Sequence, residues 1–182
     1  MAAAARALAR CAATTGVLLA RHRIHLPRTH VGMRLRFADG TSARVYRETV
    51  VDHPAPFDPC VLVVRFRLRA VRGRLGHAAL RAESLPNTPL FLGFPEYVPE
   101  LWLAHDEHGV YCGLDEWDDP ALAEAYARAL WRVLALVCPR ASIHYQVLPG
   151  LQRDELLRDA SLAGRALPGD GAPQWWRPGA VA

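Results

Sequence analysis

"FPEYVPELWLAHDEHGVYCGLDEWDD" (Phe94–Asp119) is the stretch that decides the fold of this chain. It contains two apolar segments, Val98–His105 and Val110–Trp117, on either side of the polar residues DEHG. Gly109 supplies the positive φ angle that a tight turn between two strands requires. The stretch therefore predicts a β-hairpin, and with it a fold built on an antiparallel sheet.

The residues around this hairpin predict a strand before it, and a helix and a strand after it. Cys60–Ala70 is a β-branched run that continues as alternating arginine and apolar residues, as expected of a strand. After the hairpin, a helix begins at an N-cap formed by Asp118 or Asp119 and ends before Pro139. Ile143–Leu148 is the final strand.

Together with the helical composition of Arg74–Leu85, these segments give the order βαββαβ. Right-handed crossovers then place both helices on one face of a four-stranded antiparallel sheet, which is an α+β fold of the ferredoxin-like type. The opposite face carries apolar side chains and must be covered. A second copy of the chain, the N-terminal hairpin and a bound ligand are the three candidates for covering it.

The remaining segments flank this unit. A hairpin is expected before it, with strands Met33–Phe37 and Ser42–Val50 around an Asp-Gly turn. In the C-terminal tail, Trp175 and Trp176 are candidates to fix an otherwise flexible segment to the surface. The expected organisation has four parts: a helical Ala/Arg-rich extension at residues 1–30, the hairpin and a proline-rich linker at 31–59, the ferredoxin-like domain at 60–150, and a C-terminal helix with a flexible tail at 151–182.

The composition favours one globular domain and argues against nucleic-acid binding. At 51% hydrophobic residues, a chain of 182 residues can bury a sizeable core. Most of the 22 basic residues lie in the first half of the chain, but all of them are arginine and no nucleic-acid-binding motif accompanies them. The four cysteines stand far apart, which indicates reduced, buried thiols rather than disulfides or a zinc site.

The N-terminal segment favours a cytoplasmic protein. Its longest uncharged run, Cys11–Ala20, is shorter than the roughly 20 apolar residues that cross a bilayer. Arg10 interrupts the apolar stretch that a cleaved signal peptide needs. We expect an arginine-rich helix that lies on the domain or on a membrane surface, so peripheral membrane contact through residues 1–26 stays open.

The polar residues of the opening stretch carry little chemistry. Four of them, His105–His108, surround a turn where side chains splay outward, so we expect a solvated hairpin tip rather than a metal site. Asp115 and Glu116 are neighbours on one strand and point to opposite faces of the sheet, so at most one of them enters a pocket. We assign no metal ligand.

The sheet face away from the helices offers the better candidate site. The first and last strands are neighbours in this topology, so Arg65, His144 and Gln146 can meet there. Trp102 and Tyr111 are candidates to join them, with the register left open. A neutral histidine beside an arginine can remove a proton from a phenol or enol, and the arginine can hold the resulting oxyanion. The alternative is that these residues make polar contacts across a dimer interface.

The stretch "SLPNTPLFLGFPEYVPELWLAHDEHGVYCGLDEWDDPALAEAYARAL" (Ser84–Leu130) resembles the dimeric α/β-barrel superfamily, in particular its branch of proteins like the antibiotic-biosynthesis mono-oxygenases. The sequence departs from the family at Glu96, where members keep glycine. The positions that carry the resemblance are Pro95 and Tyr97 in a turn, Trp102 on a strand, Gly109–Trp117 on the next strand, and Ala123–Leu130 on a helix.

This resemblance implies a homodimer of ferredoxin-like units with a pocket for a hydrophobic small molecule in each subunit. It implies a cofactor-independent mono-oxygenase-like or cyclase-like enzyme that acts on a phenolic or polycyclic molecule. We assign His144 as the base and Arg65 as the anion stabiliser. The expected substrate-binding residues are Trp102, Tyr111, Gln146 and Tyr97. The alternative is a non-catalytic module of the same fold that binds a small ligand or haem, with His105 or His144 as the axial ligand.

Overall fold

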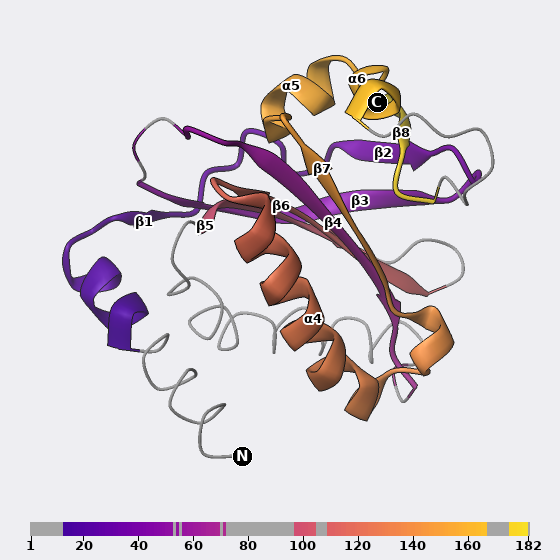
Figure 1. Ribbon diagram of the computed structural model, residues 1–182, viewed down its shortest axis with the longest axis horizontal. Coiled ribbons are helices and arrows are strands. Elements are labelled where there is room, and N and C mark those ends of the chain that lie inside the picture. Colours follow the sequence, from indigo (N-terminus) through magenta and orange to yellow (C-terminus); the bar gives the residue numbers. More distant parts are fainter. Residues whose placement is uncertain are drawn as a thin grey trace.

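One curled antiparallel sheet forms the framework of the protein, as the computed structural model shows (Figure 1). The structure describes residues 13–52, 54, 56–69, 71, 97–104, 109–166 and 175–181. The sheet has eight strands: β1 (Ile24–His25), β2 (Arg34–Phe37), β3 (Ser42–Val51), β4 (Cys60–Arg67), β5 (Tyr97–Ala104), β6 (Val110–Trp117), β7 (His144–Pro149) and β8 (Pro178–Val181). The helical elements are residues 13–20, α4 (Pro120–Val137), the short 3-10 turn η1 (Arg140–Ser142), α5 (Arg153–Arg158) and α6 (Leu162–Ala166).

The middle of the sheet is consistent with a ferredoxin-like fold. β4 lies between β7 and β6, and β5 pairs with the other edge of β6, which gives the order β7-β4-β6-β5. The predicted neighbourhood of the first and last strands of the unit, β4 and β7, is therefore confirmed. α4 connects β6 to β7 and packs against β4 and β7 (Figure 1). The helix predicted at residues 74–85 lies outside the described residues.

α4 begins and ends where its sequence signals place it. Asp119 Oδ1 accepts hydrogen bonds from the backbone N–H groups two and three residues further on, at 2.7 and 3.1 Å. The side chain of Asp118 instead accepts hydrogen bonds from the backbone N–H groups of Phe57 and Asp58 in the linker. Asp119 is therefore the cap, and Asp118 ties the linker to the start of the helix.

The N-terminal hairpin extends the sheet at the edge of β5. β3 pairs with β5, β2 pairs with β3, and β8 from the C-terminal tail pairs with β2. Gly40 in the β2–β3 turn has a φ of +83°, as the Asp-Gly signal predicts. The tail was expected to be flexible apart from its two tryptophans. Trp176 is indeed buried in a core, but the four residues of β8 that follow add an edge strand that the sequence did not predict.

β3 changes the face on which its side chains lie at an irregularity between Val45 and Arg47. Val45 is buried in the core on one face of the sheet. After the extra residue Tyr46, Arg47 lies on the opposite face, over the ring of Trp102 at 4.2 Å, and Glu48 lies on the face of Val45. A β-bulge of this kind resets the alternation of a strand by one residue.

The two faces of the sheet carry separate cores. We call the side of α4 the helix face, and its core comprises Val51, Cys60, Leu62, Val64, Trp117, Ala123, Tyr126 and Ala127. We call the opposite side the closed face. Its core includes Leu35, Val45, Val61, Val63, Leu101, Leu103, Leu114, Leu148, Leu156, Ala163 and Trp176. The alternation of β4, in which Leu62 and Val64 lie on one face and Val61 and Val63 on the other, separates the two cores.

The closed face is covered by the chain itself. α5, α6 and Trp176 pack on it, and the curl of the sheet brings the hairpin residues Leu35 and Val45 into the same core (Figure 1). Val61 and Val63 are both 0% exposed in the single chain. Of the three expected covers, the N-terminal hairpin is thus one. The segment predicted as a C-terminal helix forms α5 and α6, which also cover this face, a role that was not predicted. This packing leaves no exposed apolar face among the described strands for the expected sheet-to-sheet pairing of two copies.

Arg153 at the start of α5 is fixed to the sheet by buried carboxylates. Its backbone N–H donates to Glu116 at 2.8 Å, and its guanidinium lies 3.2 Å from Glu48. His30 lies against the same carboxylate of Glu48, with 2.9 Å between its Nδ1 and Oε1. Both Arg153 and Glu48 are buried. Charges buried this deeply need partners, so the contacts of Arg153 with Glu48 and Glu116 fix the position of α5 on the sheet.

Two further expectations concern the membrane and the cysteines. Among the described helices, none is long and apolar enough to cross a membrane. Cys60, Cys112 and Cys138 are buried free thiols, as predicted. Burial raises the pKa of Cys60 to about 12 and that of Cys138 to about 11. The thiols of Cys60 and Cys138 therefore stay protonated at neutral pH and are poor nucleophiles.

Replacement of Glu48 tests the role of the buried charges. Glu48→Ala leaves the Arg153 guanidinium without its sheet partner, so we expect a loss of about 3–5 kcal/mol in the free energy of unfolding. Urea unfolding followed by circular dichroism measures it. The matched control is Asp52→Ala, which removes the half-exposed pair with His25 and should cost less than about 1 kcal/mol. Equal losses in the two variants would contradict the assignment.

Candidate functional site

A groove of about 350 Å³ opens on the closed face, near the end of β4 and the start of β7. Register places its central residues, because Arg65 of β4 pairs with His144 of β7 on one side and with Cys112 of β6 on the other. Arg65 is largely buried, whereas His144 is exposed to solvent. The residues that line the groove are Arg65, Arg67, Val110, Ser142, His144 and Trp175.

The structure brings together two of the predicted site residues. Arg65 and His144 are direct cross-strand neighbours, as the topology predicted. Gln146 shares their face, opposite Val63, but its side chain donates a hydrogen bond to the carbonyl oxygen of Val147 at 3.1 Å. Gln146 does not line the groove. Arg65 and His144 therefore lie side by side at the groove, and Gln146 lies outside it.

Trp175 adds an aromatic wall that the sequence did not assign to the site. Its ring centroid lies 5.6 Å from that of His144, with 46° between the ring planes. The residue follows the C-terminal helices and precedes β8, so the pairing of β8 with β2 holds it over the groove. The sequence predicted only that Trp175 and Trp176 fix the tail. Trp176 performs that function, and Trp175 faces the groove.

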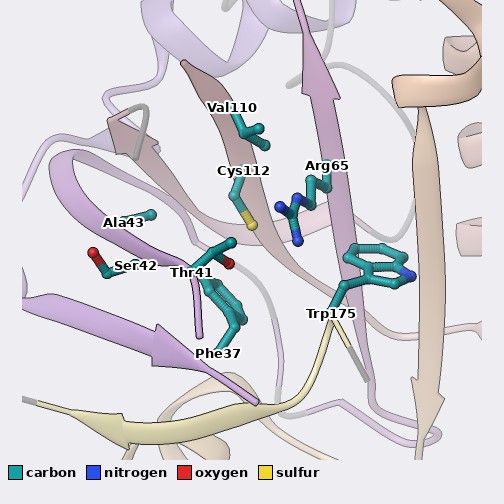
Figure 2. A pocket seen from close by; sticks show the side chains of 8 residues that line it. All are labelled: Phe37, Thr41, Ser42, Ala43, Arg65, Val110, Cys112 and Trp175. Carbon is teal, nitrogen blue, oxygen red and sulfur yellow. The ribbon is translucent and has the colours of Figure 1, made fainter. Parts of the chain in front are cut away.

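A smaller cavity of about 10 Å³ lies beside the groove and shares Arg65, Val110 and Trp175 with it (Figure 2). A cavity of this volume is about the smallest that can hold one water molecule. It is bounded by the β2–β3 turn on one side and by β4 and β6 on the other, and its lining residues are Phe37, Thr41, Ser42, Ala43, Arg65, Val110, Cys112 and Trp175.

Asp39 in the β2–β3 turn holds the guanidinium of Arg65. The two form an ion pair through Nη1 and Oδ2. Thr41 donates to the same carboxyl group from its backbone N–H at 3.0 Å and from its hydroxyl at 2.6 Å. Burial alone would raise the pKa of Asp39, but the hydrogen bonds from Thr41 and Arg65 outweigh burial and lower it. The carboxylate is thus ionised at neutral pH and orients Arg65 toward the cavities.

Three predicted substrate-binding residues lie elsewhere. Tyr111 is on the helix face, where its ring stacks on Phe66 with centroids 5.9 Å apart. Trp102 is also on the helix face, because it pairs with Gly113 and lies under Arg47. Tyr97 pairs through its backbone with Trp117, at the end of the sheet far from the groove. Grouping these residues with Arg65 and His144 was wrong, since the alternation along β5 and β6 puts them on other parts of the sheet.

The helix face instead contains a buried pair of carboxyl groups. Glu100 of β5 and Asp115 of β6 are cross-strand partners, and each is less than 10% exposed. Gly113 leaves room beside them, since an added Cβ would lie 3.5 Å from Asp115 and 3.9 Å from Glu100. Burial, followed by the charge and the hydrogen bond of Glu100, raises the pKa of Asp115 well above its usual range. The pair therefore retains a proton to a higher pH than an isolated carboxyl group would.

The acidic residues of the hairpin lie in different surroundings in the structure. Asp115 and Glu116 do lie on opposite faces, Asp115 beside Glu100 and Glu116 against the backbone of Arg153. The pairing of Glu100 with Asp115 was missed, although two residues equidistant from a hairpin turn can be matched by counting. His105–His108 lie outside the described residues. Within the described ranges, no group of three His, Cys, Asp or Glu side chains is placed to hold a metal ion.

We compared the chain with protein-family models, with curated proteins and with solved structures. No family model matches the chain, and no curated protein matches it. The structure is similar to that of an uncharacterised ferredoxin-fold protein related to antibiotic biosynthesis mono-oxygenases from Listeria monocytogenes, with a TM-score of 0.40 and 11% identity over 68% of this chain and 89% of that one.

Replacement of Asp115 tests the proton of the buried pair. When folding raises the pKa of a carboxyl group, the folded protein loses stability as the pH rises. The loss runs from the pKa of the group in the unfolded chain, about 4, to its pKa in the folded protein. Asp115→Asn removes this dependence, so the variant should gain stability at neutral pH relative to the wild type and match it below about pH 4. Each unit of pKa elevation corresponds to about 1.4 kcal/mol at neutral pH.

The measurement is urea unfolding between acidic and neutral pH. Asp58→Asn, at an exposed position in the linker, serves as the control and should show no such trend. A difference between Asp115→Asn and the wild type that does not change with pH would show that the carboxyl is not protonated in the folded state.

Proposed function

We propose that the groove binds a small phenolic or enolic molecule and removes a proton from it. His144 is the base, and Arg65 holds the oxyanion that forms. The observation that carries this proposal is the pairing of His144 with Arg65 at one register position, with the tilted ring of Trp175 beside the imidazole. Deprotonation of this kind begins both the mono-oxygenase-like and the cyclase-like reactions predicted from the sequence.

The dimensions of the groove favour a small ligand. Its volume of about 350 Å³ is at the lower end of the range for small-molecule sites, roughly 300–1,000 Å³. We therefore infer a molecule of one or two rings rather than a larger polycyclic one. The indole of Trp175 offers an apolar surface on which such a ring can stack.

His144 and Arg65 have separate roles in this reaction. The imidazole of His144 is exposed, so it can take a hydroxyl proton and pass it to solvent. The Arg65 guanidinium, fixed by Asp39, presents donors to the oxygen on which negative charge develops. The ring carbon made electron-rich by deprotonation then attacks dioxygen in a mono-oxygenase-like reaction, or a carbonyl carbon of the same molecule in a cyclase-like one.

The binding of 4-nitrophenol tests this assignment, because its anion absorbs visible light and the neutral form does not. Binding to the wild type should raise the fraction of anion at a pH where the free probe is mostly neutral. The double variant Asp39→Asn/Arg65→Met should bind the anion about tenfold more weakly, because a hydrogen bond to a charged group contributes about 1.5–3 kcal/mol. Asp39→Asn alone is its control, since it retains Arg65.

His144→Ala should reduce the rise in anion on binding, because the protonated imidazole of the wild type adds a positive charge beside the anion that Arg65 holds. His25→Ala is the matched control, since His25 is also half-exposed but bonds to Asp52 away from the groove. Unchanged binding and ionisation in His144→Ala would remove His144 from the mechanism. A Soret band that appears on addition of haem and needs His144 would favour the alternative, a haem-binding module.

A further inference from the structure

α4 exposes a set of apolar residues beside its charged ones. Its inner side packs on the sheet through Ala123, Tyr126 and Ala127, which are buried. Its outer side exposes Arg128 and Arg132, and beside them the apolar residues Leu122, Ala125, Ala129, Val133, Leu136 and Val137. Leu136 is 78% exposed and Val133 58%. The outer side of a surface helix is normally polar, so large apolar side chains this exposed indicate a surface that a partner can cover.

The outer residues form a stripe with a symmetric spacing. We define the outer stripe as Leu122, Ala125, Ala129, Val133 and Leu136. The two leucines lie seven residues before and seven residues after Ala129, and Ala125 and Val133 lie four residues before and after it. Steps of three and four residues keep all five on one side of the helix. The stripe therefore has leucine at both ends and alanine at its centre, with Ala125 and Val133 at the two intermediate positions.

This symmetry fits a second copy of the same helix. In a two-fold pair, each residue meets the residue at the same distance on the other side of the axis. An antiparallel copy centred on Ala129 would set Leu122 against Leu136 of the second copy and Ala125 against Val133. Alanine at the centre permits close approach of the two backbones, and leucine at the ends fills the space as the helices diverge.

The charges along one edge of the stripe support the same arrangement. Glu124, Arg128 and Arg132 follow each other at intervals of four residues, so they share that edge. In an antiparallel two-fold pair, this edge meets its own copy in reverse order, which brings Arg132 near Glu124 of the other copy. It also sets the two Arg128 side chains on either side of the axis, each paired with the Glu124 of its own chain. Within one chain, Glu124 already lies 2.9 Å from Arg128 and accepts a hydrogen bond from Tyr145 at 2.9 Å, so its carboxylate is held in place.

We propose that the protein forms a two-fold homodimer in which the outer stripes of two α4 helices pack antiparallel about Ala129. The interface differs from the sheet-to-sheet pairing that the family resemblance implies, because the closed face is already filled by the chain's own residues. It is also independent of the groove, whose residues come from β4, β6, β7 and the C-terminal tail. A lipid surface would use the exposed apolar residues as well, but it would not require their symmetry.

Disulfide trapping tests the position of the two-fold axis. Ala129→Cys places a thiol at the axis, so mild oxidation should give a covalent dimer on a non-reducing gel. Ala121→Cys is the matched control, since it is exposed on the same helix but lies eight residues from the axis and should stay monomeric on the gel. Both variants carry Cys11→Ser, because the cysteines at 60, 112 and 138 are buried.

Sedimentation equilibrium tests the stripe without cross-linking. The wild type should sediment as a dimer, and Leu136→Glu should raise the dissociation constant at least tenfold with an unchanged circular dichroism spectrum. Leu26→Glu, at an exposed leucine outside α4, should leave the dimer intact. A monomeric wild type, or a dimer that neither Leu136→Glu nor the cross-linking pattern affects, would overturn the proposal. Monomers that bind phosphatidylserine vesicles through Leu136 would overturn it in favour of a membrane surface.

Discussion

The arrangement of the protein depends on the pair of buried carboxylates that hold Arg153. Glu116 accepts the backbone N–H of Arg153, and Glu48 neutralises its guanidinium, so the start of α5 is fixed on the sheet. α6, Trp176 and β8 follow from that point and close one face of the sheet. Because the described residues close this face within one chain, a ligand can reach the face at the edge groove, and a second copy would have to pack on another surface.

The parts of the fold that the sequence predicted are those encoded by local patterns. The β5–β6 hairpin follows from two apolar segments around Gly109, and α4 follows from its cap, its periodicity and the proline beyond it. The parts it did not predict depend on partners distant in the chain. β8 is a strand only because β2 lies beside it, and α5 covers the closed face only because Arg153 meets Glu48. Neither short segment has a pattern of its own that records such a partner.

The candidate site was predictable to the same extent. Arg65 and His144 could be paired because strand order and alternation together fix the face on which each lies. Trp175 could not be placed there, since its position follows from the edge strand after it. The pairing of Glu100 with Asp115 shows a different limit. Each carboxylate has an ordinary interpretation alone, and only the hairpin register reveals that two acids share a buried position.

The bulge at Tyr46 gives β3 a freedom of length that composition does not reveal. Because Tyr46 is the extra residue, its loss would leave Val45 and Arg47 as consecutive residues that still pair with Leu103 and Trp102. Arg47 would stay over Trp102 and Glu48 beside Arg153, so the buried charges would keep their partners. Among homologous chains that retain this closed sheet, β3 should therefore vary in length by one residue at this point while the faces of Arg47 and Glu48 stay the same.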